Sequence, residues 1–173
     1  MLKNNSILKY IIALGLIAIV AIVAGISVQS VIESQKTSAS VINISAKQRM
    51  YSQRIALFAN SLNLASDSIE IIRHKRVIEQ LKNEMTVAHQ ALLYGNDSLN
   101  LPSIQSDAIT KMYFELPFNL NQQIEAYLSE VDIFLNSNDS TDKKNAFIII
   151  NASASGRLLI TLDKMVNQYE KEM

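Results

Sequence analysis

The stretch VINISAKQRMYSQRIALFANSLNLA, residues 41–65, decides the fold class of this chain. Its apolar residues and one glutamine recur in alternating steps of three and four, at Val41, Ile44, Gln48, Tyr51, Ile55, Phe58, Leu62 and Ala65. A repeat of about 3.5 residues is typical of a helix that packs along a left-handed seam. No proline or glycine lies between Gly25 and Gly95. We therefore expect one unbroken helix to enter this stretch from its N-terminal side.

The same stretch carries positive charge beside the seam. Because successive helical residues turn by about 100°, one further strip is formed by Ser45, Arg49, Ser52, Ala56 and Ala59. Small side chains at this spacing allow a second helix, such as that of another subunit, to approach closely. Arg54 points about 140° away from Arg49, so the two cannot grip one anion within a single helix.

A symmetric dimer would bring two copies of Arg49 together across its axis. The forked guanidinium donors match planar oxyanions, and an anion between the two arginines would favour one packing of the dimer. The alternative is that Arg49 and Arg54 are surface residues paired with Asp or Glu on neighbouring helices.

Three further amphipathic segments follow. The apolar positions predict helices over 71–92, 120–134 and 148–169, and a shorter helix over 104–115 between Pro102 and Pro117. Turn-forming residues separate them at 95–97 and 136–142. The sequence therefore predicts an all-α protein in which an N-terminal transmembrane helix is followed by an antiparallel up-down four-helix bundle.

The N-terminal segment predicts a membrane anchor. Tyr10 to Val28 is apolar and uncharged, which is close to the roughly 20 residues that cross a bilayer as a helix. Because Lys3 and Lys9 precede it, we expect residues 1–9 in the cytoplasm, 10–31 as a single-pass signal anchor in the inner membrane, and 32–173 as the extracytoplasmic, periplasmic domain. A cleaved signal peptide is the alternative.

The composition argues against several classes of protein. Lys+Arg and Asp+Glu number 16 each, without the basic excess of a nucleic-acid binder. The chain has no cysteine and only two histidines, so we expect no disulfide, metal site or cofactor. No phosphate-binding loop or nucleophile elbow is found, and we expect neither catalytic residues nor enzymatic activity.

A family resemblance enters through residues 41–60. They resemble the opening helix of the type IV pili methyl-accepting chemotaxis transducer N-terminal (PilJ-type) domain, and the periplasmic helix of the nitrate/nitrite sensor kinases. The shared pattern is Asn43, Ser45-Ala46, Arg49-Met50, Ser52 and Arg54. HQALLYGNDSLNLP and SGRLLITLDKMVNQYEKE are similar to later family segments, so the resemblance covers about residues 36–173.

The resemblance implies an all-helical extracytoplasmic sensor that is usually dimeric. In the nitrate-sensing members, the arginine of the Arg-Met pair binds the anion across the dimer interface. That role carries over to Arg49, with Ala46, Met50 and Ser52 as the other expected ligand-binding residues. Asn43, Gln53 and Arg54 are expected to be structural parts of the motif. Ala46 stands where the family usually has glycine, and its methyl group narrows the room for close backbone approach.

Two functions remain open at this point. The first is the sensory input domain of a membrane-bound bacterial signal-transduction protein, of the chemotaxis transducer or sensor kinase type. It would be a homodimer that senses a small oxyanion such as nitrate or nitrite. The second is a membrane-anchored helical interaction module without ligand sensing, which would assemble with another receptor or a pilus component.

Overall fold

The computed structural model describes residues 2–104 and 106–172, and within them every regular element is helical. The elements are α1 (Leu2–Leu64), α2 (Ser68–Tyr94), the 3₁₀ turn η1 (Asp97–Leu99), α3 (Asp107–Phe114), α4 (Leu120–Asn136), α5 (Ser140–Ser155) and α6 (Arg157–Glu172). The all-α prediction is confirmed. So is the unbroken first helix, because α1 contains both the apolar N-terminal run and the whole of residues 41–64.

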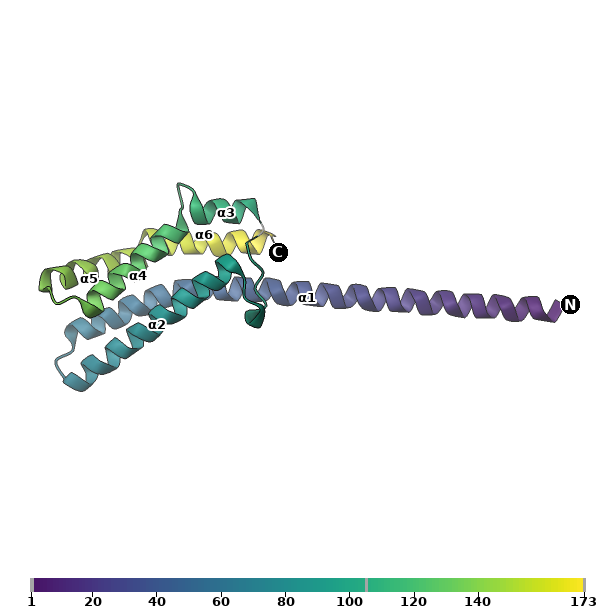
Figure 1. Ribbon diagram of the computed structural model, residues 1–173, viewed down its shortest axis with the longest axis horizontal. Helices are drawn as coiled ribbons and strands as arrows, with labels where there is room; N and C mark the ends of the chain where they lie inside the picture. Colours follow the sequence, from purple (N-terminus) through teal and green to yellow (C-terminus); the bar gives the residue numbers. More distant parts are fainter. Residues whose placement is uncertain (1, 105, 173) are drawn as a thin grey trace. The chain divides into compact units, whose positions relative to one another are not determined.

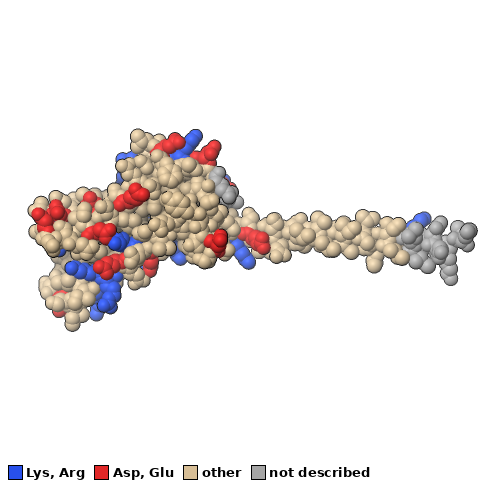
Figure 2. All heavy atoms as spheres, viewed as in Figure 1, with Lys and Arg blue, Asp and Glu red and all other residues tan. Residues whose placement is uncertain are grey.

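The chain divides into two units, residues 1–37 and residues 38–173. In the first unit the large apolar side chains from Tyr10 to Ile32 are exposed, and Figure 2 shows no charged side chain along this run. Two helical stretches, Lys9–Leu64 and Ser140–Glu172, are long and apolar enough to cross a membrane. In the most apolar part of the first stretch no residue is buried, whereas in the most apolar part of the second stretch a third of the residues are buried.

The second unit, called the outer domain below, has a core to which each of the described α-helices, α1 to α6, contributes buried side chains. Within it α2 runs back along α1, and α5 runs back along α4 (Figure 1). Each of these helices, together with α6, contributes buried apolar side chains to one cluster, which includes Ile55, Met85, Ile124, Ile150 and Leu162. The stretch Ser140–Glu172 thus supplies part of this core, which accounts for its apolar composition.

The predicted seam of the first helix lies against that core. Val41, Tyr51 and Ile55 are buried, as is the polar Gln48. Ile44, Phe58 and Leu62 are partly buried and pack against the same cluster. Because the 3.5-residue period and the burial agree over these positions, the inward face of α1 could be predicted from the sequence.

Two elements differ from the prediction. The fourth amphipathic segment is split at Gly156, whose amide donates to the Ser153 carbonyl instead of continuing the regular ladder. The short helix begins at Asp107 rather than at Ile104, because the Ser106 hydroxyl accepts from the amides of Ala108 and Ile109 and caps it. The four-helix topology and the boundaries at residues 9 and 31 stay predictions.

Candidate functional site

The small-residue strip of α1 faces the interior of its own chain. Ser45, Ser52, Ala56 and Ala59 are all buried within the outer domain. The Tyr127 hydroxyl of α4 donates to the Ser52 main-chain carbonyl at 2.7 Å, and the Ser52 hydroxyl donates to the Arg49 carbonyl. The prediction that this strip faces a second subunit is therefore wrong. Small side chains are needed here because α4 of the same chain approaches.

Arg49 stands at the edge of that strip and is paired. Its Nη1 donates to the Asp163 Oδ1 of α6 at 2.6 Å, and the two side chains are 48% and 42% exposed. The expected alternative, a surface arginine paired with an acidic residue on a neighbouring helix, is thus confirmed for Arg49. Arg54 is exposed and makes no ion pair with the described residues. An exposed pair of this kind contributes about 0–1 kcal/mol to the stability of the fold.

A different strip of α1 is open to solvent. We call it the α1 outer strip, and it consists of Asn43, Ala46, Met50, Gln53, Leu57, Asn60 and Leu64. Its members alternate in steps of three and four, and all are exposed except the half-buried Ala46. Leu57 and Leu64 are 61% and 81% exposed. This spacing is that of a coiled-coil seam, and the outer strip lies next to Arg49.

The structure thus separates the predicted site residues. Asn43, Ala46, Met50 and Gln53 lie on the outer strip, while Ser52 is buried and cannot reach a ligand there. The sequence did carry a signal for the outer strip, because Met50, Leu57 and Leu64 follow one another seven residues apart. That signal was hidden by the more apolar inward seam.

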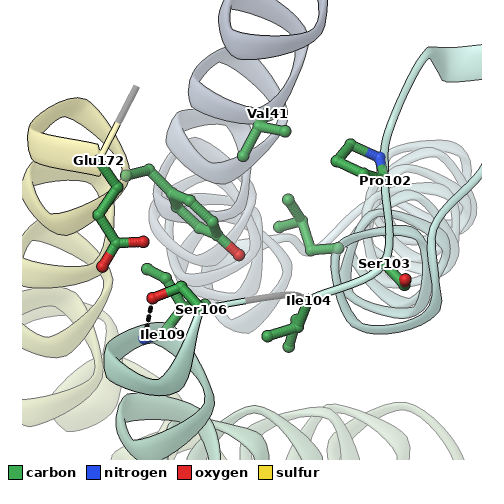
Figure 3. A pocket seen from close by; sticks show the side chains of 9 residues that line it. Val41, Pro102, Ser103, Ile104, Ser106, Ile109 and Glu172 are labelled. Carbon is green, nitrogen blue, oxygen red and sulfur yellow. Dashed lines mark hydrogen bonds between the residues drawn. The ribbon is translucent and has the colours of Figure 1, made fainter.

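An apolar cavity of about 230 Å³ lies at one end of the outer domain. It is lined by Val41, Leu92, Pro102, Ser103, Ile104, Ser106, Ile109, Tyr169 and Glu172. Its walls come from α1, α2, α3, α6 and the segment before α3. Figure 3 shows that the Ser106 hydroxyl is turned toward the start of α3. The cavity contains none of the predicted site residues, and it is small beside the roughly 300–1,000 Å³ of ordinary ligand pockets.

A polar cluster that runs from the buried His89 to the exposed Glu125 joins α2 to α4. The His89 Nε2 lies 2.7 Å from the Asn121 Oδ1, and the Asn121 amide donates to the Glu125 carboxylate at 3.0 Å. With Nε2 protonated, Asn121 accepts, and the buried Nδ1 has no partner among the described residues. Burial lowers the pKa of His89, against the opposing effects of the Asn121 hydrogen bond and the Glu125 charge. The imidazole is therefore held neutral.

We expect His89 to make the outer domain less stable in mild acid. The folded-state pKa of His89 is depressed, so its contribution is present above the unfolded pKa of about 6.5 and is lost as pH falls below it. Urea unfolding of the full chain in micelles should show a free energy that declines toward about pH 5, by at most roughly 1.4 kcal/mol per pH unit from this group. In His89→Gln the decline should be shallower. An unchanged slope in that variant would contradict the assignment.

Other buried hydroxyls lie nearby. The Tyr169 and Tyr113 hydroxyls are 3.4 Å apart. Burial raises the pKa of Tyr113 well above its ordinary value and that of Tyr169 to about 12. Both phenols stay neutral at physiological pH. Within residues 2–104 and 106–172, no group of three His, Asp or Glu side chains is placed to hold a metal ion.

The comparisons with known proteins give one match. Residues 30–147 match the family model described as the type IV pili methyl-accepting chemotaxis transducer N-terminal domain, PilJ. This region is more than half of the chain and runs from within α1 into α5. No curated protein and no solved structure matches the chain.

Proposed function

The chain belongs to the PilJ family, the N-terminal input domains of type IV pili methyl-accepting chemotaxis transducers, and we propose that it senses a ligand outside the cytoplasmic membrane. The observation that carries this proposal is α1, a single helix that contains both the apolar run and the signature stretch around Arg49. A ligand that alters the packing of residues 41–64 would thereby move the membrane helix. The chain would catalyse no reaction of its own.

Four packed helical segments would transmit the change. They are the outer part of α1, then α2, α4 and the α5–α6 pair, arranged as an antiparallel up-down bundle with α3 in the crossover. The support is a set of polar contacts between these segments. Asn60 of α1 bonds Asn151 of α5 at 2.6 Å, Lys82 of α2 pairs with Asp132 of α4, and Tyr127 of α4 bonds the α1 backbone.

The α1 outer strip would be the seat of a second copy of the chain. Its heptad spacing and its exposed Met50, Leu57 and Leu64 suit parallel packing of two α1 helices. Such a dimer would bring the two Arg49 side chains near one another. Since like charges repel, a small planar oxyanion such as nitrate or nitrite would stabilise this arrangement by replacing Asp163 on each guanidinium.

Titration of the full chain in nanodiscs with nitrate and nitrite tests this proposal. Native protein should give saturable heat, Arg49→Ala should bind at least tenfold more weakly because it loses a charge-assisted donor, and Asp163→Asn should bind more tightly because a competitor is gone. Arg73→Ala, an exposed arginine of α2, is the matched control. Sedimentation of the same samples should show a dimer that Met50→Arg weakens.

The interaction module without ligand sensing is the second candidate. The Arg49–Asp163 pair favours it, because the guanidinium already holds a carboxylate. Native protein and Asp163→Asn would then both give no heat with either anion, while the dimer would still form. Equal binding by the native chain and Arg49→Ala would exclude the anion site at Arg49 in either case.

A further inference from the structure

A second cavity, of about 590 Å³, lies at the end of the outer domain where α1 turns into α2 and α4 turns into α5. Figure 1 shows both turns at this end of the domain. We call it the lysine cavity. It is lined by Leu62, Asn63, Lys75, Phe134, Ser140, Lys143, Lys144, Phe147 and Ile148. Its volume falls within the roughly 300–1,000 Å³ that small-molecule sites occupy.

The charge in this cavity is of one sign. Lys75, Lys143 and Lys144 line it, and its lining contains no Asp or Glu. None of the three ammonium groups is in an ion pair with the described residues, and Lys143 is half-buried. Figure 2 shows basic side chains gathered near this end of the domain. The cavity lining therefore carries positive charge that no acidic residue within the lining balances.

Two acidic residues close to Lys143 and Lys144 in the sequence are engaged elsewhere. The Asp139 carboxylate accepts from the Thr141 and Asp142 amides and caps α5, and these bonds lower the pKa of Asp139. Asp142 lines a separate hollow together with Glu130 and Asp132. Neither Asp139 nor Asp142 lines the lysine cavity, so a ligand would have to bring the compensating negative charge.

The rest of the lining is apolar and aromatic. The Phe134 and Phe147 rings lie 5.9 Å apart at a tilt of 35°. Phe134 is buried, Phe147 and Leu62 are half-buried, and Ile148 is 54% exposed. An exposed apolar surface beside free ammonium groups suits a ligand with an apolar body and one anionic end. Nitrate offers no apolar surface, so this chemistry differs from that proposed for Arg49.

We propose that the lysine cavity binds a small organic carboxylate with an aromatic or aliphatic body. The carboxylate would lie among Lys75, Lys143 and Lys144, and the body would cover Phe147 and Leu62. The cavity walls come from α1, α2, α4 and α5. The ligand would therefore tie the α1–α2 hairpin to the α4–α5 hairpin and relieve the repulsion between their lysines.

Titration of the full chain in nanodiscs with phenylacetate, and with hexanoate for the aliphatic class, tests the proposal. Native protein should bind at least one of them saturably at millimolar concentrations. Each exposed charge pair contributes little alone, so two lysines are replaced together. The double variant Lys143→Gln/Lys144→Gln should bind about tenfold more weakly, which corresponds to about 1.4 kcal/mol. Added salt should weaken native binding as well. Lys111→Gln, an exposed lysine of α3 outside the cavity, should bind like the native chain.

Two comparisons separate this site from other sources of heat. Phenethylamine, with the same ring and the opposite charge, should not bind, and Arg49→Ala should bind phenylacetate like the native chain. No saturable binding of either carboxylate by native protein would overturn the proposal. So would equal binding by the double lysine variant, or equal binding of phenethylamine. The nitrate proposal is tested separately, because Arg49→Ala should weaken nitrate binding and the lysine substitutions should not.

Discussion

Replacing Tyr127 by alanine is expected to destabilise the outer domain by about 3–5 kcal/mol, the usual cost of deleting a buried aromatic side chain. Tyr127 is 1% exposed, and its hydroxyl donates to the Ser52 carbonyl at 2.7 Å. Burial raises the pKa of this phenol, so it stays a neutral donor. The substitution would leave a cavity between α4 and α1 and remove the bond that ties α4 to the signature stretch.

Urea unfolding of the full chain in micelles, followed by far-ultraviolet circular dichroism, measures this effect. Tyr127→Phe keeps the ring and loses only the hydrogen bond, so its cost should be about 1 kcal/mol. Tyr94→Ala removes the same side chain from a position that is 75% exposed, and it should change the stability by less than about 0.5 kcal/mol. A cost for Tyr127→Ala no larger than that for Tyr94→Ala would contradict the packing of α4 on α1.

The inward face of α1 could be predicted because its residues obey one period. Tyr51 and Ile55 follow the 3.5-residue seam, and both are buried. The neighbouring strip could not be assigned in the same way. Ser45 and Ser52 carry no apolar signal, and only the folded chain shows that both are buried. At Ser52 the covering side chain is Tyr127, which lies 75 residues further along the sequence. A small polar residue on a helix is compatible with a subunit contact and with an internal one.

Pairings between residues that are distant in the sequence could not be predicted either, because they too depend on how the folded helices approach one another. Arg49 and Asp163 are 114 residues apart, and no local rule selects Asp163 from 16 acidic residues. The lysine cavity likewise joins Lys75 to Lys143 and Lys144 across two hairpins. The break at Gly156 was also missed. A lone glycine is tolerated within a helical pattern, and whether it ends the helix depends on the packing around it.

Introducing two arginines into the apolar run, as Ile19→Arg with Ile22→Arg, is expected to release the chain from the membrane. Tyr10 to Val28 contains eleven Leu, Ile and Val residues, which together favour insertion by about 3–7 kcal/mol on the biological scale, where each contributes roughly 0.3–0.6. Each arginine near the centre of a spanning helix costs about 2.5–3.5 kcal/mol. Ile19→Arg with Ile22→Arg also removes two favourable residues. The net free energy of insertion therefore becomes unfavourable over most of this range.

Alkaline carbonate extraction of membranes measures the outcome, because it releases peripheral proteins and retains integral ones. Native protein should stay in the pellet, and the double variant should move to the supernatant. Ile69→Arg with Ile72→Arg is the matched control, since these residues of α2 are 67% and 59% exposed in the outer domain and should leave the chain in the pellet. Retention of the Ile19/Ile22 variant would show that the apolar run is not the anchor. That result would also remove the mechanical link, through α1, between the signature stretch and the membrane.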